Sequence, residues 1–314
     1  MATTIVLVHG DLDGMTSGIL LLKGLEADTG IKITNGKRLA STLIELANHD
    51  QSIQSIYIAD IPLIEEQVAA VEMALRNLHR REIKIHLFDH HIGWELSGTH
   101  LIQYFETNII DSKKTTAAAL VWKYFLRRDP AASRWLGMLS QKDKSIDESI
   151  RRDFILLQSL MQPENWPKTS LVLTALARDL PIDKERETLT SYQAKHVMKE
   201  KEIANNAIIF ETLKSRRIGK VDLRGQDGYF YISKLIIELH SVDLALTITN
   251  KKIILSSDSI DRGIDLSSLH GYHERCGMRF SIAGHKNPVS IQPITGAINE
   301  EFIDIICNFI KEKL

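Results

Sequence analysis

Residues 4–14 read TIVLVHGDLDG, and this stretch decides the fold prediction. Thr4–Val8 is an apolar, β-branched run, which predicts a buried strand. A polar segment, His9–Asp13, follows that run directly. Helical spacing of apolar residues then extends over Met15–Glu26. A strand that leads through a polar turn into a helix indicates the start of a strand–helix unit.

The same alternation recurs along the first half of the chain. Strand-like runs occur over Ser52–Ala59 and Glu82–Phe88, with a helical pattern between them. Such alternation indicates a parallel sheet with crossover helices. In open parallel sheets, ligands bind at the carboxyl ends of the strands. Together with Thr4–Val8, these runs make three, and each ends in polar residues: His9–Asp13, Asp60 and Asp89–His91. We therefore expect these polar residues to gather at one edge of the sheet, where the carboxyl ends of the strands lie.

The second half of the chain has a different composition and sequence pattern. The region 183–217 is charged and lacks proline and glycine, which predicts one long helix that connects two domains. Beyond it, short strand-like runs such as Tyr229–Ser233 precede a terminal amphipathic helix over Glu300–Lys313. The predicted fold class is α/β: a parallel-sheet domain over 1–182, a helical linker over 183–217 and a smaller α+β domain over 218–314.

Composition argues against several classes of protein. The chain carries a formal net charge of −1, so it gives no global electrostatic signal for a long duplex or an anionic membrane. No apolar stretch reaches the about 18 residues of a membrane span, and the N-terminus reads as a strand rather than a signal peptide. Cys276 and Cys307 lie outside any zinc-like CxxC pair and indicate reduced thiols. We expect a cytoplasmic protein that binds no membrane.

The segment His-Gly-Asp-Leu-Asp-Gly suggests a metal site. Its two acids, Asp11 and Asp13, are two residues apart, and carboxylates this close repel unless a cation or a shared proton lies between them. Oxygen and imidazole ligands suit a hard divalent cation, so His9 is a further candidate ligand. Gly14 lets the backbone approach a ligand closely. A capped turn with solvated acids is the alternative interpretation.

Two more motifs follow the next two strand-like runs. Asp60 fits either a metal site or an ordinary helix cap, since Pro62 favours a helix start nearby. His90 and His91 are adjacent and directly follow an apolar strand, which is an uncommon arrangement. Imidazole is the commonest metal ligand, and the neighbouring Asp89 can orient it. A surface loop with chance histidines is the alternative for this motif.

Candidate residues also occur later in the chain. Asp143 stands in a charged stretch, where Asp147 competes with it for the same role. In the second domain Gly284 permits a tight turn, and the adjacent His285 and Lys286 offer charged donors to a phosphate. An ordinary glycine turn with a polar tail fits that segment equally well. The candidate anion contacts there are Gly284, His285, Lys286, Arg262 and Arg279.

In this order, the motifs resemble those of the DHH phosphoesterase superfamily: His-x-Asp-x-Asp-Gly, a lone Asp after a strand, Asp-His-His and a later Asp. The Ala-Gly-His segment over 283–285 is similar to the Gly-Gly-His signature of its partner domain, DHHA1. The resemblance covers nearly the whole chain. It implies two divalent metal ions, with Mn²⁺ expected and Mg²⁺ as the alternative, at a site that hydrolyses phosphate esters.

The resemblance also implies roles for single residues. Metal ligands are expected at His9, Asp11, Asp13, Asp60, His90 and Asp143. Asp60 is expected to bridge the two ions. The expected catalytic residues are Asp89, His90 and His91, with His91 also contacting phosphate. Gly284 and His285 are expected to hold substrate in the second domain, beside the anion contacts named above.

Superfamily members include RecJ-type exonucleases, oligoribonucleases that degrade nanoRNA, cyclic-dinucleotide phosphodiesterases and family II pyrophosphatases. The near-neutral charge argues against a strong grip on long polymers, and 6% aromatic residues argue against an extended base-stacking track. We therefore expect hydrolysis of short single-stranded RNA or DNA to mononucleotides. The alternatives are a RecJ-type single-strand exonuclease, a phosphatase for a small nucleotide (a cyclic dinucleotide or 3′-phosphoadenosine 5′-phosphate), a pyrophosphatase, and a non-catalytic nucleic-acid-binding scaffold. A homodimer is left open.

Overall fold

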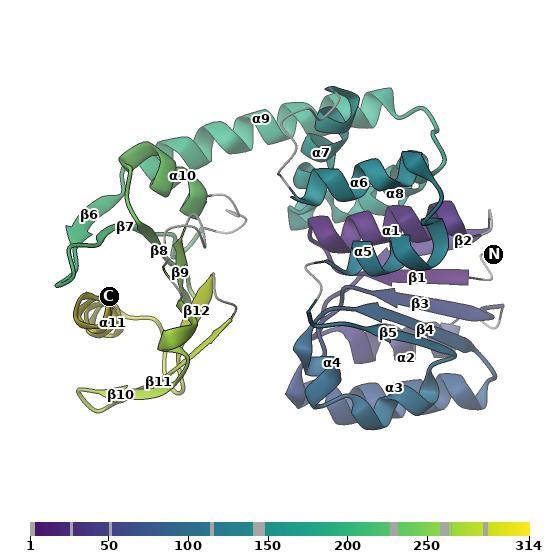
Figure 1. Cartoon of the computed structure of the whole chain (residues 1–314), viewed down its shortest axis with the longest axis horizontal. Helices are drawn as coiled ribbons and strands as arrows, with labels where there is room; N and C mark the ends of the chain where they lie inside the picture. Colours follow the sequence, from purple (N-terminus) through teal and green to yellow (C-terminus); the bar gives the residue numbers. More distant parts are fainter. Residues whose placement is uncertain are drawn as a thin grey trace. The chain divides into compact units, whose positions relative to one another are not determined.

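The computed structural model contains two compact units, Met1–Gln193 (unit 1) and Ala194–Leu314 (unit 2). Each unit contains one β-sheet (Figure 1). The structure describes residues 4–25, 28–49, 52–113, 116–140, 148–226, 232–257, 264, 266–284 and 288–314.

Unit 1 is built on a five-stranded sheet in the order β2-β1-β3-β4-β5. Every neighbouring pair in this sheet is parallel, as predicted. The strands are β1 (Thr4–Val8), β2 (Thr29–Ile33), β3 (Ser55–Ala59), β4 (Lys84–Asp89) and β5 (Thr107–Ile110). The central strands are apolar because helices cover both faces of the sheet, so that side chains on either face enter a core.

Helices form a layer on each face of the sheet of unit 1 (Figure 1). One layer contains α1 (Leu12–Gly24), α5 (Ala117–Val121), α6 (Pro130–Ser140), α7 (Glu148–Leu160) and α8 (Thr169–Ala177). The other contains α2 (Leu39–His49), α3 (Val68–Arg80) and α4 (Ile92–Leu96). Helix α1 approaches the sheet closely at Gly18, where a Cβ atom would lie 2.6 Å from Cδ1 of Ile31. This close packing holds the middle of α1 against the sheet.

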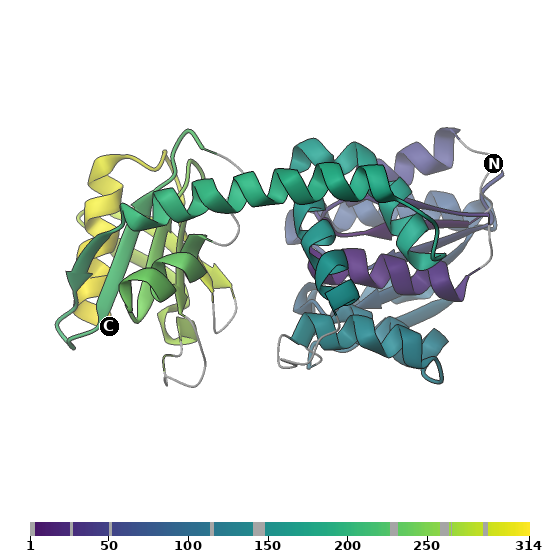
Figure 2. The ribbon, with the colours of Figure 1, turned by 90° about the horizontal axis from the view of Figure 1, so that it is seen from above.

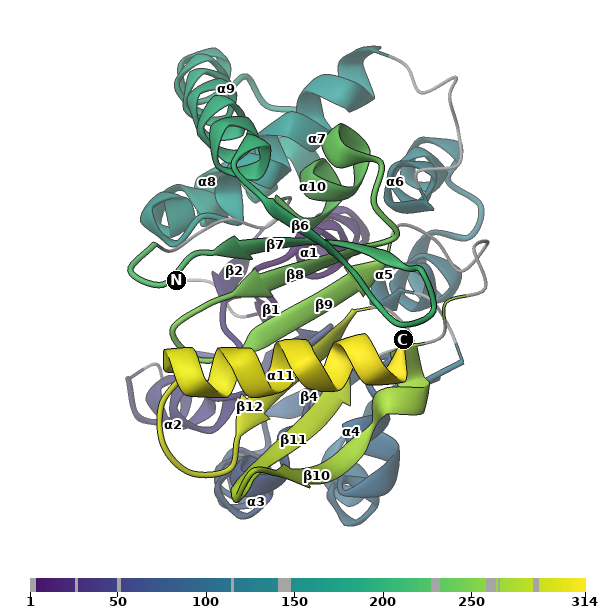
Figure 3. The same ribbon diagram turned by 90° about the vertical axis from the view of Figure 1, so that its left-hand side faces the viewer.

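Unit 2 contains a seven-stranded mixed sheet in the order β10-β11-β12-β9-β8-β7-β6 (Figure 3). Its strands are β6 (Ile208–Glu211), β7 (Arg217–Asp222), β8 (Leu244–Ile248), β9 (Ile253–Ser257), β10 (Gly271–Arg275), β11 (Met278–Gly284) and β12 (Val289–Pro293). The helices are α10 (Ile232–His240) and α11 (Glu300–Lys313). Phe302, Ile306 and Phe309 of α11 are buried in the core against this sheet. The two sheets together confirm the predicted fold class, an α/β domain with a smaller α+β domain.

The helix predicted over 183–217 is shorter in the structure. Helix α9 spans Asp183–Asn205 (Figure 2), and β6 and β7 follow it. The run Ile208–Phe210 lacks proline and glycine, but its β-branched and aromatic residues favour a strand, and β6 pairs with β7. The boundary between the units falls within α9, at Gln193 and Ala194.

The strand predicted over Tyr229–Ser233 is wrong at its C-terminal end. Ile232 and Ser233 begin α10, whereas residues 227–231 lie outside the described part of the chain. The apolar residues Ile232, Ile236 and Ile237 recur at helical spacing and are buried, so burial along one helix face overrides the local β-propensity.

Among the helices that the structure describes, none combines the length and the apolar composition that crossing a membrane requires.

Candidate metal centre

The polar segments predicted from the sequence follow three strands that are neighbours in the sheet. Strands β1, β3 and β4 lie side by side, and His9–Asp13, Asp60 and His90–His91 continue from their carboxyl ends. The parallel direction of the strands thus brings together residues that lie far apart in the sequence. The structure gathers these side chains at one edge of the sheet of unit 1.

Asp11 ends the turn after β1 and caps α1. Its Oδ1 accepts the N–H of Gly14 at 2.9 Å, and His9 Nδ1 donates to its Oδ2 at 2.8 Å. A Cβ atom on Gly14 would collide with the carbonyl oxygen of His9, so this turn requires glycine. Burial by itself would raise the pKa of Asp11, but the hydrogen bond and charge of His9 and the Gly14 N–H bring the pKa to about 2. Asp11 is therefore ionised and ready to bind a cation.

Asp60 follows β3 in a backbone conformation that is rare for a residue with a side chain. Its φ is 61°, in the left-handed region, where asparagine and aspartate are tolerated best. Only 1% of Asp60 is exposed, and its N–H donates to the carbonyl oxygen of Phe88 at 3.1 Å. Conformations of this kind cluster at functional sites, where the surrounding structure holds them.

Asp89 is the last residue of β4 and is fully buried. Its Oδ1 accepts both the backbone N–H of His91 at 2.6 Å and the Nδ1–H of the same residue at 2.8 Å. This contact fixes the tautomer and the orientation of the His91 ring and leaves its Nε2 for another partner. Asp89 is therefore a positioning residue for His91.

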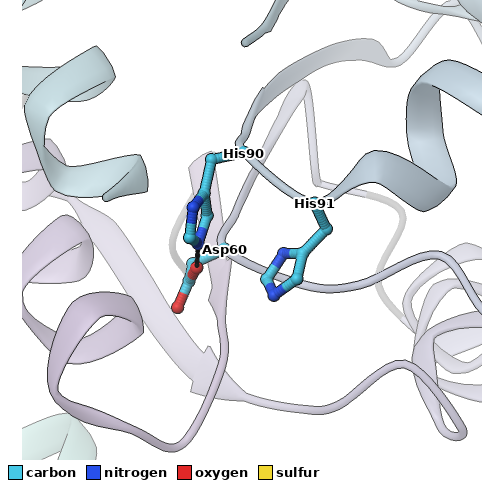
Figure 4. Close-up of side chains that lie close together, drawn as sticks. All are labelled: Asp60, His90 and His91. Carbon is cyan, nitrogen blue, oxygen red and sulfur yellow. Dashed lines mark hydrogen bonds and ion pairs between the residues drawn. The ribbon is translucent and has the colours of Figure 1, made fainter. Parts of the chain in front are cut away.

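His90 lies between two carboxylates. Its Nε2 is 3.1 Å from Oδ1 of Asp60 and 3.5 Å from Oδ2 of Asp13. Figure 4 shows His90 and His91 extending from the same loop, with the dashed contact joining His90 to Asp60. Both imidazoles therefore lie close to the carboxylate of Asp60.

Two groups of side chains offer ligand atoms close enough for one ion each. One group contains His9, Asp11 and Asp60, and the other contains Asp60, His90 and His91. Within each group, one ligand atom from every residue lies within 4.8 Å of the others. Asp60 belongs to both groups, and a carboxylate with two oxygens can bridge two ions.

Asp13 belongs to neither group but borders the second one. Its Oδ2 and Oδ1 accept the backbone N–H groups of Ala117 and Ala118 at 2.7 and 2.9 Å, at the start of α5. The same Oδ2 is the atom near His90. A carboxylate oxygen has more than one lone pair, so these hydrogen bonds leave Asp13 able to bind a cation.

No family model matches the chain, and no curated protein sequence does. Among solved structures, a DHH-domain protein described as a member of a family of ribosomal proteins matches with a TM-score of 0.63 and 14% identity, over 99% of this chain and 87% of that chain. RecJ from Thermus thermophilus, in complex with Mn²⁺, matches with a TM-score of 0.54 and 14% identity, over 98% of this chain and 51% of RecJ. The chain has the DHH fold. The resemblance found in the sequence is thus confirmed at the level of the fold, and the chain spans about half the length of RecJ.

The electrostatics at the carboxyl ends of β1, β3 and β4 favour a bound cation. Burial, with the charges of Asp11 and Asp13 adding to it, raises the pKa of Asp60 well above its usual range. Burial also raises the pKa of Asp13, although the N–H groups of Ala118 and Ala117 oppose this. Within the described residues, Oδ2 of Asp60 is buried without a hydrogen-bond partner. Carboxylate oxygens and imidazole nitrogens are ligands that Mn²⁺ and Mg²⁺ accept, so the residues present fit divalent ions.

Several predicted site residues belong to unit 2 or lie outside the described residues. Asp143, Arg262, His285 and Lys286 belong to the segments that the structure does not describe. Gly284 is the last residue of β11 in unit 2. Arg279 is exposed on the same strand, opposite Glu274 of β10. Their predicted contacts with substrate stay predictions.

The contribution of α5 to this cluster was not predicted from the sequence. Two backbone N–H groups, those of Ala117 and Ala118, hold Asp13 from more than a hundred residues along the chain. Backbone groups carry no side-chain identity, so a motif search has no signal for them. The nearest signal is Thr116, which caps α5 through its side chain and therefore marks a helix start.

Proposed function

We propose that the protein is a metal-dependent phosphoesterase that hydrolyses the phosphodiester bonds of short single-stranded RNA or DNA and releases mononucleotides. The observation that carries this proposal is the pair of ligand groups that share the buried carboxylate of Asp60. Two divalent ions bound there would polarise a phosphoryl group and lower the pKa of a water molecule between them. His9, Asp11 and Asp60 would hold one ion. Asp60 and His90 would hold the other, with Asp13, which borders that second group, in place of His91.

The protein side chains have separate tasks in this proposal. Asp89 accepts from Nδ1 of His91 and so directs Nε2 of that ring toward the substrate. Burial lowers the pKa of His91, but the hydrogen bond and charge of Asp89, together with the charges of Asp11 and Asp13, raise it by more, so the ring is more readily protonated than an ordinary histidine. Nε2 can then donate to a phosphoryl oxygen and offset its charge. No protein nucleophile is required.

Two observations support short substrates and Mn²⁺. The net charge of −1 provides little of the long-range attraction that binds long nucleic acids. The structure of RecJ, which shares the fold, is a complex with Mn²⁺. We therefore infer Mn²⁺ as the first ion to test, with Mg²⁺ beside it.

The free cysteines support a cytoplasmic location for the protein. Cys276 is exposed and Cys307 is buried, and both are free thiols. Free thiols on a protein surface suit the reducing conditions of the cytoplasm.

One observation favours a second candidate, a nucleic-acid-binding scaffold without catalysis. The DHH-domain structure that matches most of this chain is described as a member of a family of ribosomal proteins. The buried acids favour the enzyme, because like charges in one place are costly unless a cation offsets them.

Hydrolysis of labelled oligonucleotides separates these two functions. The purified protein is incubated with Mn²⁺ and with 5′-labelled RNA and DNA, each in very short and in long form. We expect mononucleotides from the short substrates. The variant His90→Ala should lose this activity, whereas His79→Ala, which removes an exposed histidine of α3, should retain it. Binding of the oligonucleotides without any cleavage would contradict the enzyme and favour the scaffold.

A further inference from the structure

The indole of Trp166 lies against Gly10, the residue between the candidate ligands His9 and Asp11. A Cβ atom added to Gly10 would be 3.3 Å from Cζ2 and 3.6 Å from Cε2 of Trp166. It would also be 3.3 Å from Cγ2 of Ile33, at the end of β2. Two apolar side chains thus pack against the backbone at the point where the metal-binding loop leaves β1.

Buried hydrogen bonds of a neighbouring residue hold the helix that carries Trp166. Trp166 belongs to the short helix η4 (Pro163–Lys168), where the neighbouring Asn165 is 5% exposed and donates from Nδ2 to the carbonyl oxygen of Ser159 at 2.9 Å. Ser159 is fully buried in α7, and its Oγ donates to the carbonyl oxygen of Leu189 in α9 at 2.7 Å. The element that carries the indole is therefore tied to two longer helices of unit 1.

The size of the indole, and not its hydrogen-bonding group, accounts for tryptophan at this position. Nε1 of Trp166 is buried and has no hydrogen-bond partner in the described part of the chain. Burying an unpaired N–H is unfavourable, and phenylalanine would avoid that cost. The nearer of the two atoms beside Gly10, Cζ2, lies in the outer part of the six-membered ring of the indole. A benzene ring attached directly to Cβ does not extend as far.

Gly10 needs such external support. Glycine has no Cβ and visits a wide range of backbone angles, so by itself Gly10 would let its two neighbours rotate relative to each other. His9 and Asp11 must nevertheless keep their side chains on one ion. Their mutual hydrogen bond of 2.8 Å shows that the two side chains already converge.

We propose that Trp166 is a positioning residue for the ligand group of His9, Asp11 and Asp60, an inference that rests on the proposed function. Packing of its indole on Gly10 fixes the backbone between two of the three ligands. His90 follows β4 and lies outside the loop that the indole contacts. Loss of the indole therefore weakens one metal site more than the other.

Metal titration of the metal-free protein tests this inference. Mn²⁺ stoichiometry and affinity are measured by calorimetry and by electron paramagnetic resonance for the wild type and for Trp166→Ala. The matched control is Trp122→Ala, because Trp122 is also partly buried in unit 1 with a buried Nε1 that has no partner among the described residues. We expect two sites in the wild type and in the control. In Trp166→Ala, one site should weaken by about 10–100-fold, the usual effect of losing a residue that orients a ligand, while the other is retained.

A conservative variant guards against simple unfolding. Trp166→Phe keeps an aromatic ring at the position, so it should fold and show an intermediate loss at the same single site. Two sites of unchanged affinity in Trp166→Ala, or equal losses in Trp166→Ala and Trp122→Ala, would overturn the inference. Failure of the wild type itself to bind Mn²⁺ would instead remove the proposed function, and the inference with it.

Discussion

At the scale of single residues, Asp60 connects most of the observations on the site. It is the one residue common to the two ligand groups found among the described residues. It is 1% exposed, and its backbone adopts a φ of 61°. A buried carboxylate in an unfavourable conformation and near other acids is costly in the metal-free protein. Binding of cations offsets that cost, which is why we assign Asp60 the bridging role.

Replacing Asp60 by asparagine tests that role. Asp60→Asn keeps the shape and tolerates a positive φ, but removes the charge that both ions would share. We expect Mn²⁺ binding to be lost at both sites and hydrolysis to fall by more than about 100-fold, since even residues that only orient ligands are worth about 10–100-fold. Calorimetric titration and the oligonucleotide assay measure the two effects. Two intact Mn²⁺ sites in this variant would show that Asp60 does not bridge.

A substitution at Asp89 separates positioning from metal binding. Asp89→Asn still offers an oxygen to the His91 N–H but loses the negative charge beside the ring. We expect kcat to fall by about 10–100-fold while Mn²⁺ stoichiometry stays unchanged. Steady-state kinetics with parallel metal titration measures both quantities. Loss of an ion together with activity would make Asp89 a ligand and refute the positioning role.

At the scale of helices and strands, the sequence predicted central strands better than edge strands. The strand over Thr4–Val8 was predicted with its observed bounds, and β3 and β4 were predicted within a few residues. The strands β2 and β5, which form the two edges of the same sheet, were not predicted. Central strands are buried on both faces and read as apolar runs, whereas edge strands depend on pairing with a neighbour and carry a weaker pattern.

The same limit applies to the site. The gathering of Asp and His residues that directly follow apolar strands could be predicted, because residue type and position both carry the signal. The contacts that hold them could not be predicted. Asp13 receives N–H groups from 104 and 105 residues away, and Gly10 is packed by Trp166 of a different helix. Such contacts arise only once the chain is folded.

Two glycines of unit 1 should respond in opposite directions to alanine. At Gly14 a Cβ atom would meet the backbone of His9, so Gly14→Ala should lower stability and disturb Mn²⁺ binding. At Gly137 in α6 no atom of the described residues lies within 4 Å of the added atom, so Gly137→Ala should raise stability by about 1 kcal/mol through helix propensity. Thermal and denaturant unfolding measure both changes. Equal tolerance of the two substitutions would contradict the tight turn at Gly14.

At the scale of the whole molecule, the described candidate ligands all lie in unit 1, whereas unit 2 carries Arg279 and Gly284. The buried acids Asp60 and Asp89 lie together at this site in unit 1. A protein with such a site should be stabilised strongly by the ion that the site binds, because binding to the folded state alone shifts the unfolding equilibrium.

Addition and removal of metal should thus change the melting temperature. With Mn²⁺ at about 100 times its dissociation constant, binding contributes about 2.7 kcal/mol per site. For a unit of this size, that stabilisation corresponds to a rise of roughly 5–10 °C in the melting temperature per site. A chelator should reverse the rise. Differential scanning calorimetry measures the shift, with Asp60→Asn as the control that should show almost none. An equal shift in that control would place the stabilising ion elsewhere.

Anomalous diffraction at the manganese edge, from crystals grown with Mn²⁺, tests whether two ions share the carboxylate of Asp60. We predict two peaks, one on each side of the Asp60 carboxylate and about 3.5–4 Å apart. The first should lie beside His9 and Asp11, and the second beside His90. Absence of manganese from this edge of the sheet, or a single ion that does not contact Asp60, would contradict the account.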